Sequence, residues 1–305
     1  MIYLALSVLF SVLLLVNFRL FPKYDVDTMQ AISLNYIVCF ITGLILMPKG
    51  QSFVLDLTQN WTWYCFLLGI GFIITFLLSG LATQRMGMTA TSLANNVSLV
   101  LPVMASLFLF NTDMQFDVVN YLGLACAFVA LVLVSIKKET VATVAAVDAS
   151  TLKSVGVSGG LLVIGVFLMY GITNTAINFL NLNYIPNPDL TIPVTLVMVL
   201  GAMIAGSCLF VYTSWKEQKL PNKQTLIASV TLGVPNFLSF FLLILALTAF
   251  GNSGAFVYPI YNIGVILASS LIGILFFKEK LSLLNYTGLG IAFLAIVLIS
   301  YQSIF

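Results

Sequence analysis

Long runs of apolar residues, separated by short polar segments, follow one another along the whole chain. A helix needs roughly 20 apolar residues to cross about 30 Å of hydrocarbon. Ten runs reach about this length, and prolines such as Pro22 and Pro221 fall between them, where helices end. The pattern predicts helices at residues 1–21, 28–47, 61–82, 88–110, 118–136, 155–180, 190–213, 224–248, 253–277 and 282–302.

The composition agrees with a membrane protein. Of the 305 residues, 61% are hydrophobic and only 7% are charged, whereas soluble domains carry about a quarter charged residues. Within lipid every backbone N–H and C=O must pair inside the chain, so runs of this length are helices rather than barrel strands. The sequence therefore predicts an all-α polytopic protein of the cytoplasmic (inner) membrane.

Charge and cysteine content exclude several classes of function. The 12 Lys and Arg against 10 Asp and Glu leave a net charge of +2, too small for a nucleic-acid face. The chain has no histidine, and its four cysteines lie in apolar runs without CxxC spacing, so no metal, cofactor or disulfide is expected. No Walker sequence points to ATP as a direct energy source. We expect no enzymatic activity.

The basic residues predict an orientation. Eleven of the 12 Lys and Arg follow the odd-numbered helices, and only Lys49 lies on the opposite side. Short cytoplasmic loops carry the excess of Lys and Arg. Both termini are therefore expected outside the cytoplasm.

An internal repeat divides the chain. Shifted by 165 residues, segment 120–135 matches segment 285–300 at ten of sixteen positions, including Asn-Tyr-x-Gly-Leu and the final Ser. Each copy holds five predicted helices, and an odd number inverts the second copy, giving a pseudo-twofold axis in the membrane plane. We expect a first repeat at 1–140, a linker at 141–153 and a second repeat at 154–305, arranged around a central cavity.

Two local features of the repeat concern packing. Asp117 and Ser282 align and are expected to be helix N-caps. Gly123 and Gly288 each precede an alanine by four residues, the small-xxx-small spacing that allows helices to approach closely.

The end of each copy resembles a known family. Residues 276–282 (FFKEKLS), followed by Gly288 and a helix rich in small residues, resemble the end of an EamA-type repeat of the drug/metabolite transporter superfamily. Segments 93–102 (LANNVSLVLP) and 252–255 (NSGA) resemble the small residues that lead into the fourth helix of each repeat. The resemblance implies a five-plus-five inverted repeat that carries small metabolites, amino acids or drugs.

This chain departs from the family pattern in two respects. Met114 stands where Glu279 aligns in the second copy, so the acidic loop residue is not duplicated. Ten-helix members of the family are also commonly drawn with both termini in the cytoplasm, opposite to the orientation that the basic residues predict.

Neutral polar residues are the candidate site. All ten acidic residues fall in loops or at helix ends, which disfavours a proton-driven multidrug mechanism with a carboxylate in the path. Symmetry places polar residues of the fourth and ninth helices near the midplane, where inverted-repeat carriers bind substrate. The candidates, from the fourth, sixth, eighth and ninth helices, are Asn95, Asn96, Ser98, Tyr170, Asn174, Asn178, Asn236, Tyr258, Tyr261 and Asn262. The alternative for each is an interhelical hydrogen bond without a ligand.

These features together predict a carrier of a small neutral or zwitterionic metabolite that works by alternating access. The family resemblance favours export of amino-acid-like compounds. A lipid-handling carrier of the same fold is the first alternative, favoured by an apolar lateral opening. A non-transporting scaffold or partner subunit is the second, favoured by a solid bundle with its asparagines bonded to one another. The expected partners are the substrate and the lipid bilayer, and the oligomeric state stays open, with a monomer plausible.

Overall fold

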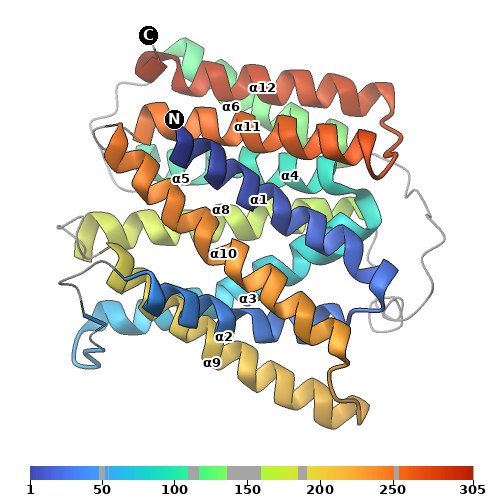
Figure 1. The fold of residues 1–305 in the computed structure, drawn as a ribbon. Coiled ribbons are helices and arrows are strands. Elements are labelled where there is room, and N and C mark those ends of the chain that lie inside the picture. The colour runs from blue at the N-terminus through green and yellow to red at the C-terminus, as the bar shows by residue number, and fades with distance from the viewer. Residues whose placement is uncertain are drawn as a thin grey trace.

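The computed structural model describes residues 1–47, 52–53, 55–108, 117–135, 159–184, 191–250 and 254–304, and the regular secondary structure within these ranges is helical (Figure 1). The first part contains α1 (Ile2–Leu20), the 3-10 turn η1 (Phe21–Tyr24), α2 (Thr28–Ile45), α3 (Asn60–Met86), α4 (Met88–Val97), α5 (Val100–Phe108) and α6 (Val118–Ser135). The second part contains α8 (Gly159–Tyr184), α9 (Thr191–Glu217), α10 (Lys223–Ala249), α11 (Gly254–Leu275) and α12 (Leu283–Ile304). The predicted linker 141–153 lies outside the described residues.

Six of these helices are long and apolar enough to cross a membrane: α1 with η1, α2, α3, α8, α9 and α10. Helices α6, α11 and α12 contain shorter apolar stretches. Counted with α4 and α5 as one rod, the described helices correspond to the ten predicted from the apolar runs. The prediction of an all-α, multi-pass membrane protein is confirmed at this level.

The fourth predicted helix, 88–110, is wrong as a single helix. It ends at Val97 and restarts at Val100 as α5. In a continuous helix the residue four positions after Ser98 would donate its N–H to the Ser98 carbonyl, but that residue is Pro102, which has none. The Leu101 N–H bonds the Ser98 carbonyl instead, at 3.0 Å. The proline therefore divides this apolar segment into two short helices.

The helices pack in a pattern that is unchanged when the two halves are exchanged. Helices α6 and α12 lie together at one side of the bundle, and α2 and α9 lie together at the other (Figure 1). Between them α1 packs on α10 and α11, while α8 packs on α3 and on the α4–α5 rod. Helix α10 contacts α2, and in the same way its counterpart α3 contacts α9, the counterpart of α2. When each of the first five rods is exchanged with its counterpart in the last five, the pairs α6–α12 and α2–α9 map onto themselves, and each of the other pairs maps onto another pair in contact.

The two predicted N-caps are confirmed. An Asp117 carboxylate oxygen accepts hydrogen bonds from the backbone N–H groups of Val119, at 2.9 Å, and Asn120, at 3.2 Å. The Ser282 hydroxyl accepts from the Asn285 N–H at 3.3 Å. The Asn120 side chain also donates to the Ile299 carbonyl near the end of α12, at 3.0 Å. The beginning of α6 is therefore bonded to the end of its counterpart.

Glycines allow two close helix crossings. A Cβ on Gly123 of α6 would lie 2.9 Å from the Ile299 backbone nitrogen of α12, so the predicted close approach at Gly123 is confirmed. The crossing of α3 and α9 is closer still, because a Cβ on Gly69 would lie 2.3 Å from the Ala202 nitrogen. Gly201 lies in the same contact. Backbones this close are typical of small-residue interfaces in membranes.

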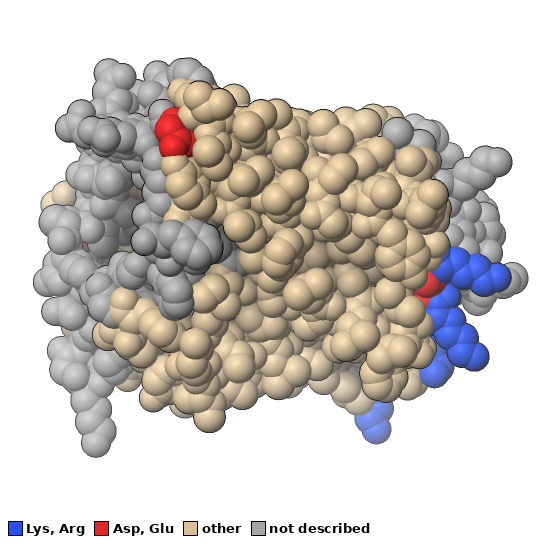
Figure 2. Space-filling model, turned by 90° about the horizontal axis from the view of Figure 1, so that it is seen from above, with Lys and Arg blue, Asp and Glu red and all other residues tan. Residues whose placement is uncertain are grey.

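All Lys and Arg residues in the described part of the chain lie at one end of the bundle, which we call the basic end. They are Arg19, Lys23, Arg85, Lys216, Lys219, Lys223, Lys278 and Lys280. Figure 2 shows such side chains gathered at one end of the molecule, with a largely uncharged surface along its length. This arrangement suits a protein that crosses the bilayer with one charged end, and the side that this end faces stays a prediction.

Candidate functional site

Neutral polar side chains from six helices meet in the middle part of the bundle, and we call them the interior polar cluster. They are Ser11 of α1, Asn35 and Tyr36 of α2, Ser79 of α3, Tyr170 of α8, Asn236 of α10, and Tyr258 and Tyr261 of α11. Counted at 1.5 Å per residue along their helices, these positions lie about 10 to 25 Å from the basic end. The cluster is therefore neither at an end of the bundle nor charged.

Two hydrogen bonds in the cluster join the two halves of the chain. The hydroxyls of Ser11 and Tyr261 are 2.6 Å apart, which connects α1 to α11. The Asn236 amide donates to the Asn35 side-chain oxygen at 3.0 Å, which connects α10 to α2. Each bond pairs one residue of the predicted first repeat with one of the second. A relative movement of the halves would change both contacts.

The Tyr36 hydroxyl is one of the deeply buried polar groups of the cluster. Tyr36 is 2% exposed, and its hydroxyl has no hydrogen-bond partner in the described part of the protein. The side chains of Asn236 and Tyr170 face it, but the approach of Asn236 does not complete a bond. Tyr170 in turn lies against Ser79. A buried hydroxyl without a partner is unfavourable, so an additional hydrogen-bond partner would stabilise this group.

Exposure within the cluster increases away from the basic end. Tyr36 is fully buried, Tyr170 and Tyr261 are half-buried, and Tyr258 is 42% exposed. Tyr258 lies in the first turns of α11, which begins at the end opposite the basic end. Among the tyrosines of the cluster, Tyr258 is therefore the most exposed, and it lies toward the end opposite the basic end.

Pro235 has the expected local effect on α10. The proline lies inside the helix and leaves the Thr231 carbonyl without its usual helical partner. The Asn17 side chain of α1 donates to this carbonyl at 3.1 Å, and the Thr231 hydroxyl donates back to Asn17 at 2.8 Å. The freed carbonyl is thus satisfied by α1. The next residue, Asn236, belongs to the cluster.

The side chains of two predicted site residues hydrogen-bond to backbone carbonyls of α4 itself. Asn96 is buried, and its amide donates to the Ser92 carbonyl at 2.7 Å. The Ser98 hydroxyl donates to the Asn95 carbonyl at 2.5 Å. These bonds satisfy backbone groups where α4 ends. The structure does not bring Asn96 or Ser98 into the interior polar cluster.

Asn95 and Asn262 lie at the same level of two antiparallel helices. The Ser92 hydroxyl of α4 approaches the Val265 carbonyl of α11 at 3.4 Å, and three residues further in each direction the register reaches Asn95 and Asn262. Asn262 is 4% exposed and Asn95 half-buried, and neither side chain hydrogen-bonds within the described structure. A ligand role for Asn95 and Asn262 stays a prediction.

Only the first of the three predicted site residues on α8 lies in the cluster. Tyr170 belongs to the cluster, while Asn174 and Asn178 follow at one-turn intervals toward the end opposite the basic end. Both asparagines are half-buried. A ligand role for these two residues stays a prediction.

Four residues of the cluster were not among the predicted site residues: Ser11, Asn35, Tyr36 and Ser79. Ser79 lies on a stripe with Thr75 and Thr83 at intervals of four residues, which places all three on one face of α3. This spacing was a usable signal. Ser11 is a single hydroxyl in an apolar helix, and only its contact with Tyr261 distinguishes it.

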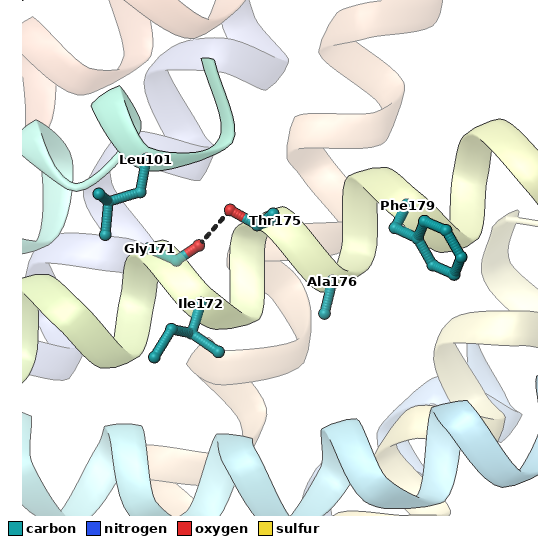
Figure 3. Close-up of a pocket in the computed structure, with 6 residues that line it drawn as sticks. All are labelled: Leu101, Gly171, Ile172, Thr175, Ala176 and Phe179. Carbon is teal, nitrogen blue, oxygen red and sulfur yellow. Dashed lines mark hydrogen bonds between the residues drawn. The ribbon is translucent and has the colours of Figure 1, made fainter. Parts of the chain in front are cut away.

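A separate apolar groove runs along the outer side of α8 beside α5 (Figure 3). Its volume is about 430 Å³, and it is lined by Leu101, Gly171, Ile172, Thr175, Ala176 and Phe179. The Thr175 hydroxyl donates to the Gly171 carbonyl at 2.7 Å, as the dashed line in Figure 3 shows. With this hydroxyl engaged, the groove is suited to hydrocarbon rather than to a polar ligand.

Comparison with known proteins identifies a distant homologue. The chain is 27% identical over 299 residues to an uncharacterized protein of Haemophilus influenzae strain Rd, covering 97% of this chain and 96% of that one. No family model matches the sequence. A solved crystal structure covers 97% of both chains with a TM-score of 0.54 at 12% identity, a likeness of fold. The EamA resemblance therefore stays a prediction.

Proposed function

We propose that this protein is a secondary membrane transporter that moves a small neutral or zwitterionic metabolite by alternating access. The interior polar cluster is its substrate site. The observation that carries the proposal is the cluster itself: a polar, uncharged centre built from both halves, in which the buried Tyr36 hydroxyl has no hydrogen-bond partner in the described part of the protein. Amino-acid-like compounds and export are the leading substrate class and direction, on the strength of the EamA resemblance.

The packing of the helices supports the inverted repeat that alternating access requires. Exchanging the rods of segments 1–140 and 154–305 preserves the principal helix pairs. Two copies related in this way can exchange slightly different conformations, which opens the centre to one face and then to the other. The bonds from Ser11 to Tyr261 and from Asn35 to Asn236 cross between the copies, where such an exchange acts.

The chemistry of the cluster favours an uncharged or zwitterionic guest. Phenol hydroxyls and amides donate and accept hydrogen bonds without imposing a net charge. Tyrosine faces attract an ammonium group, and tyrosine hydroxyls can donate to a carboxylate. An ion with an excess charge would lack a counter-charge there, because no Asp, Glu, Lys or Arg lies in the middle of the described helices.

Lipid handling is a second candidate, favoured by the apolar groove beside α8. Its 430 Å³ and its lining suit an acyl chain that enters from the bilayer. The scaffold alternative is less well supported. Asn35 and Asn236 are bonded to each other, as that alternative requires, but Asn95, Asn174 and Asn262 make no side-chain hydrogen bond to described residues.

Uptake and efflux of a labelled metabolite panel in proteoliposomes test the proposal. Tyr36→Phe removes only the buried hydroxyl, and Tyr286→Phe, on the exposed side of α12, is its matched control. Loss of one neutral hydrogen bond to substrate is expected to raise KM about three- to tenfold. A labelled phospholipid in the same panel tests the second candidate.

Movement of no metabolite above empty liposomes would contradict the transport proposal. Equal KM values for Tyr36→Phe and the parent would contradict the site. Movement of the phospholipid alone would favour lipid handling.

A further inference from the structure

A buried carboxylate joins the two halves at the basic end. Glu279 lies in the connection between α11 and α12 and is only 9% exposed. One carboxylate oxygen accepts a hydrogen bond from the Met88 N–H at 2.7 Å. The other accepts from the Thr89 hydroxyl at 2.9 Å and from the Thr89 N–H at 3.4 Å. An acidic side chain of the second half thus binds the first residues of α4 in the first half.

Two glycines make room for this carboxylate. Gly87, immediately before α4, has a φ of +97°, and a Cβ there would lie 2.5 Å from one Glu279 carboxylate oxygen. A Cβ on Gly273, in the last turn of α11, would lie 2.7 Å from the other. The Glu279 N–H also donates to the Gly273 carbonyl at 2.9 Å, which holds the connection against the end of α11. The surroundings therefore fit an acidic side chain closely on both sides.

The interaction is stronger than an ordinary surface contact. The first N–H groups of a helix have no partners within it, and the helix dipole favours an anion at this end. Hydrogen bonds to an ionised acceptor are about twice as strong as neutral ones. Met114 aligns with Glu279 in the first half, and a thioether cannot replace a carboxylate acceptor. The sequence therefore encodes this acidic side chain in only one of the two halves.

We propose that Glu279 is a latch that holds the basic end closed between α4 and α11. The proposal rests on the proposed function and adds a conformational control to it. With the latch closed, the basic end is shut over the interior polar cluster, in agreement with the burial of Tyr36 near that end and the 42% exposure of Tyr258 further from it. Opening toward the basic end requires the carboxylate to leave Met88 and Thr89. Water at that end then solvates it, which makes the step reversible.

Thiol accessibility tests the latch directly. Ser92 lies one turn further into α4 than Met88, is fully buried, and faces the Val265 carbonyl of α11. The S92C substitution, in a background in which the four native cysteines are replaced, puts a reporter thiol behind the latch. A membrane-impermeant thiol reagent is added only to the face of proteoliposomes that carries the basic end.

The thiol is expected to be protected when Glu279 is present. In E279Q and E279A it should react at least about tenfold faster, the change expected from one lost hydrogen bond to a charged group. Thr89→Val removes one donor and should give an intermediate rate, which keeps the test valid if E279A does not fold. Asp25→Asn changes an exposed carboxylate at the same end and is the matched control.

Equal protection of the thiol in folded E279Q, E279A and Thr89→Val proteins would overturn the latch, and so would an equal increase in Asp25→Asn. The measurement needs no substrate. Faster labelling of the E279 variants in a protein that moves no metabolite would leave the latch standing and remove the transport proposal. Unchanged labelling of the E279 variants in a protein that does transport would remove the latch and leave the transport proposal standing.

Discussion

The closest helix crossing in the described structure gives a sharp stability prediction. A methyl group on Gly69 of α3 would lie 2.3 Å from the Ala202 nitrogen and 2.6 Å from the Gly201 carbonyl carbon of α9. Both neighbours are backbone atoms, so no side-chain rotation relieves the clash. Gly69→Ala must therefore move the two helices apart.

The size of the effect follows from this geometry. Restoring ordinary contact requires a separation of about 1 Å, which forfeits a quarter to a half of the dispersion energy of the contacts along the crossing. Overpacking of this kind costs about 1–3 kcal/mol. At roughly 2 °C per kcal/mol for a chain of this size, Gly69→Ala should lower Tm by about 2–6 °C.

Intrinsic fluorescence is a suitable assay, because the three tryptophans of the chain lie on the two helices that cross. Trp61 and Trp63 begin α3, and Trp215 lies near the end of α9. Gly290→Ala on α12 is the matched control, since no atom lies within 4 Å of the added Cβ. Alanine is also the better helix former, so the control should melt at or above the parent temperature. Identical melting of all three proteins would refute the close α3–α9 contact.

Three further outcomes are expected. Tyr261→Phe removes the hydrogen bond between the Ser11 and Tyr261 hydroxyls and should raise the KM for transport more than it lowers kcat. A rise in KM matched by an equal fall in kcat would point to a structural role instead. The Thr58 hydroxyl and N–H donate to Asp56 and hold the pKa of this carboxyl below its ordinary value. These hydrogen bonds to the ionised carboxylate therefore stabilise the turn before α3 fully above about pH 4, and this stabilisation is lost as the pH falls through the lowered pKa of Asp56. A carboxyl NMR titration with its midpoint at or above the ordinary value would contradict this. A reporter fused to the C-terminus should be active outside the cytoplasm, and cytoplasmic activity would reverse the predicted orientation.

The helices could be predicted from the sequence because lipid imposes a simple rule on backbone pairing and length. The N-caps at Asp117 and Ser282 were equally predictable, since capping depends on a few neighbouring residues. The break at Ser98 was not predicted, although its cause, Pro102, is visible in the sequence. Hydropathy records the apolar run on both sides of the break and is insensitive to one missing N–H.

The candidate site was only partly predictable. Tyr170, Asn236, Tyr258 and Tyr261 were identified because polar groups in apolar helices are conspicuous, but their partners come from other helices. The contact of Ser11 with Tyr261 depends on how α1 and α11 pack, which no local pattern encodes. Glu279 was noted in the sequence as an unduplicated loop residue, and its contact with the start of α4 required the tertiary structure.

The uncharged centre of the bundle has an electrical consequence. Moving one elementary charge across the membrane potential changes the free energy by about 2.3 kcal/mol per 100 mV. The acidic and basic side chains of the described helices lie at their ends, so reorientation of the middle segments displaces almost none of the protein's own charge through the field. Membrane voltage would then exert little force on the empty carrier. Translocation of a guest without net charge would proceed at the same rate in polarised and depolarised vesicles.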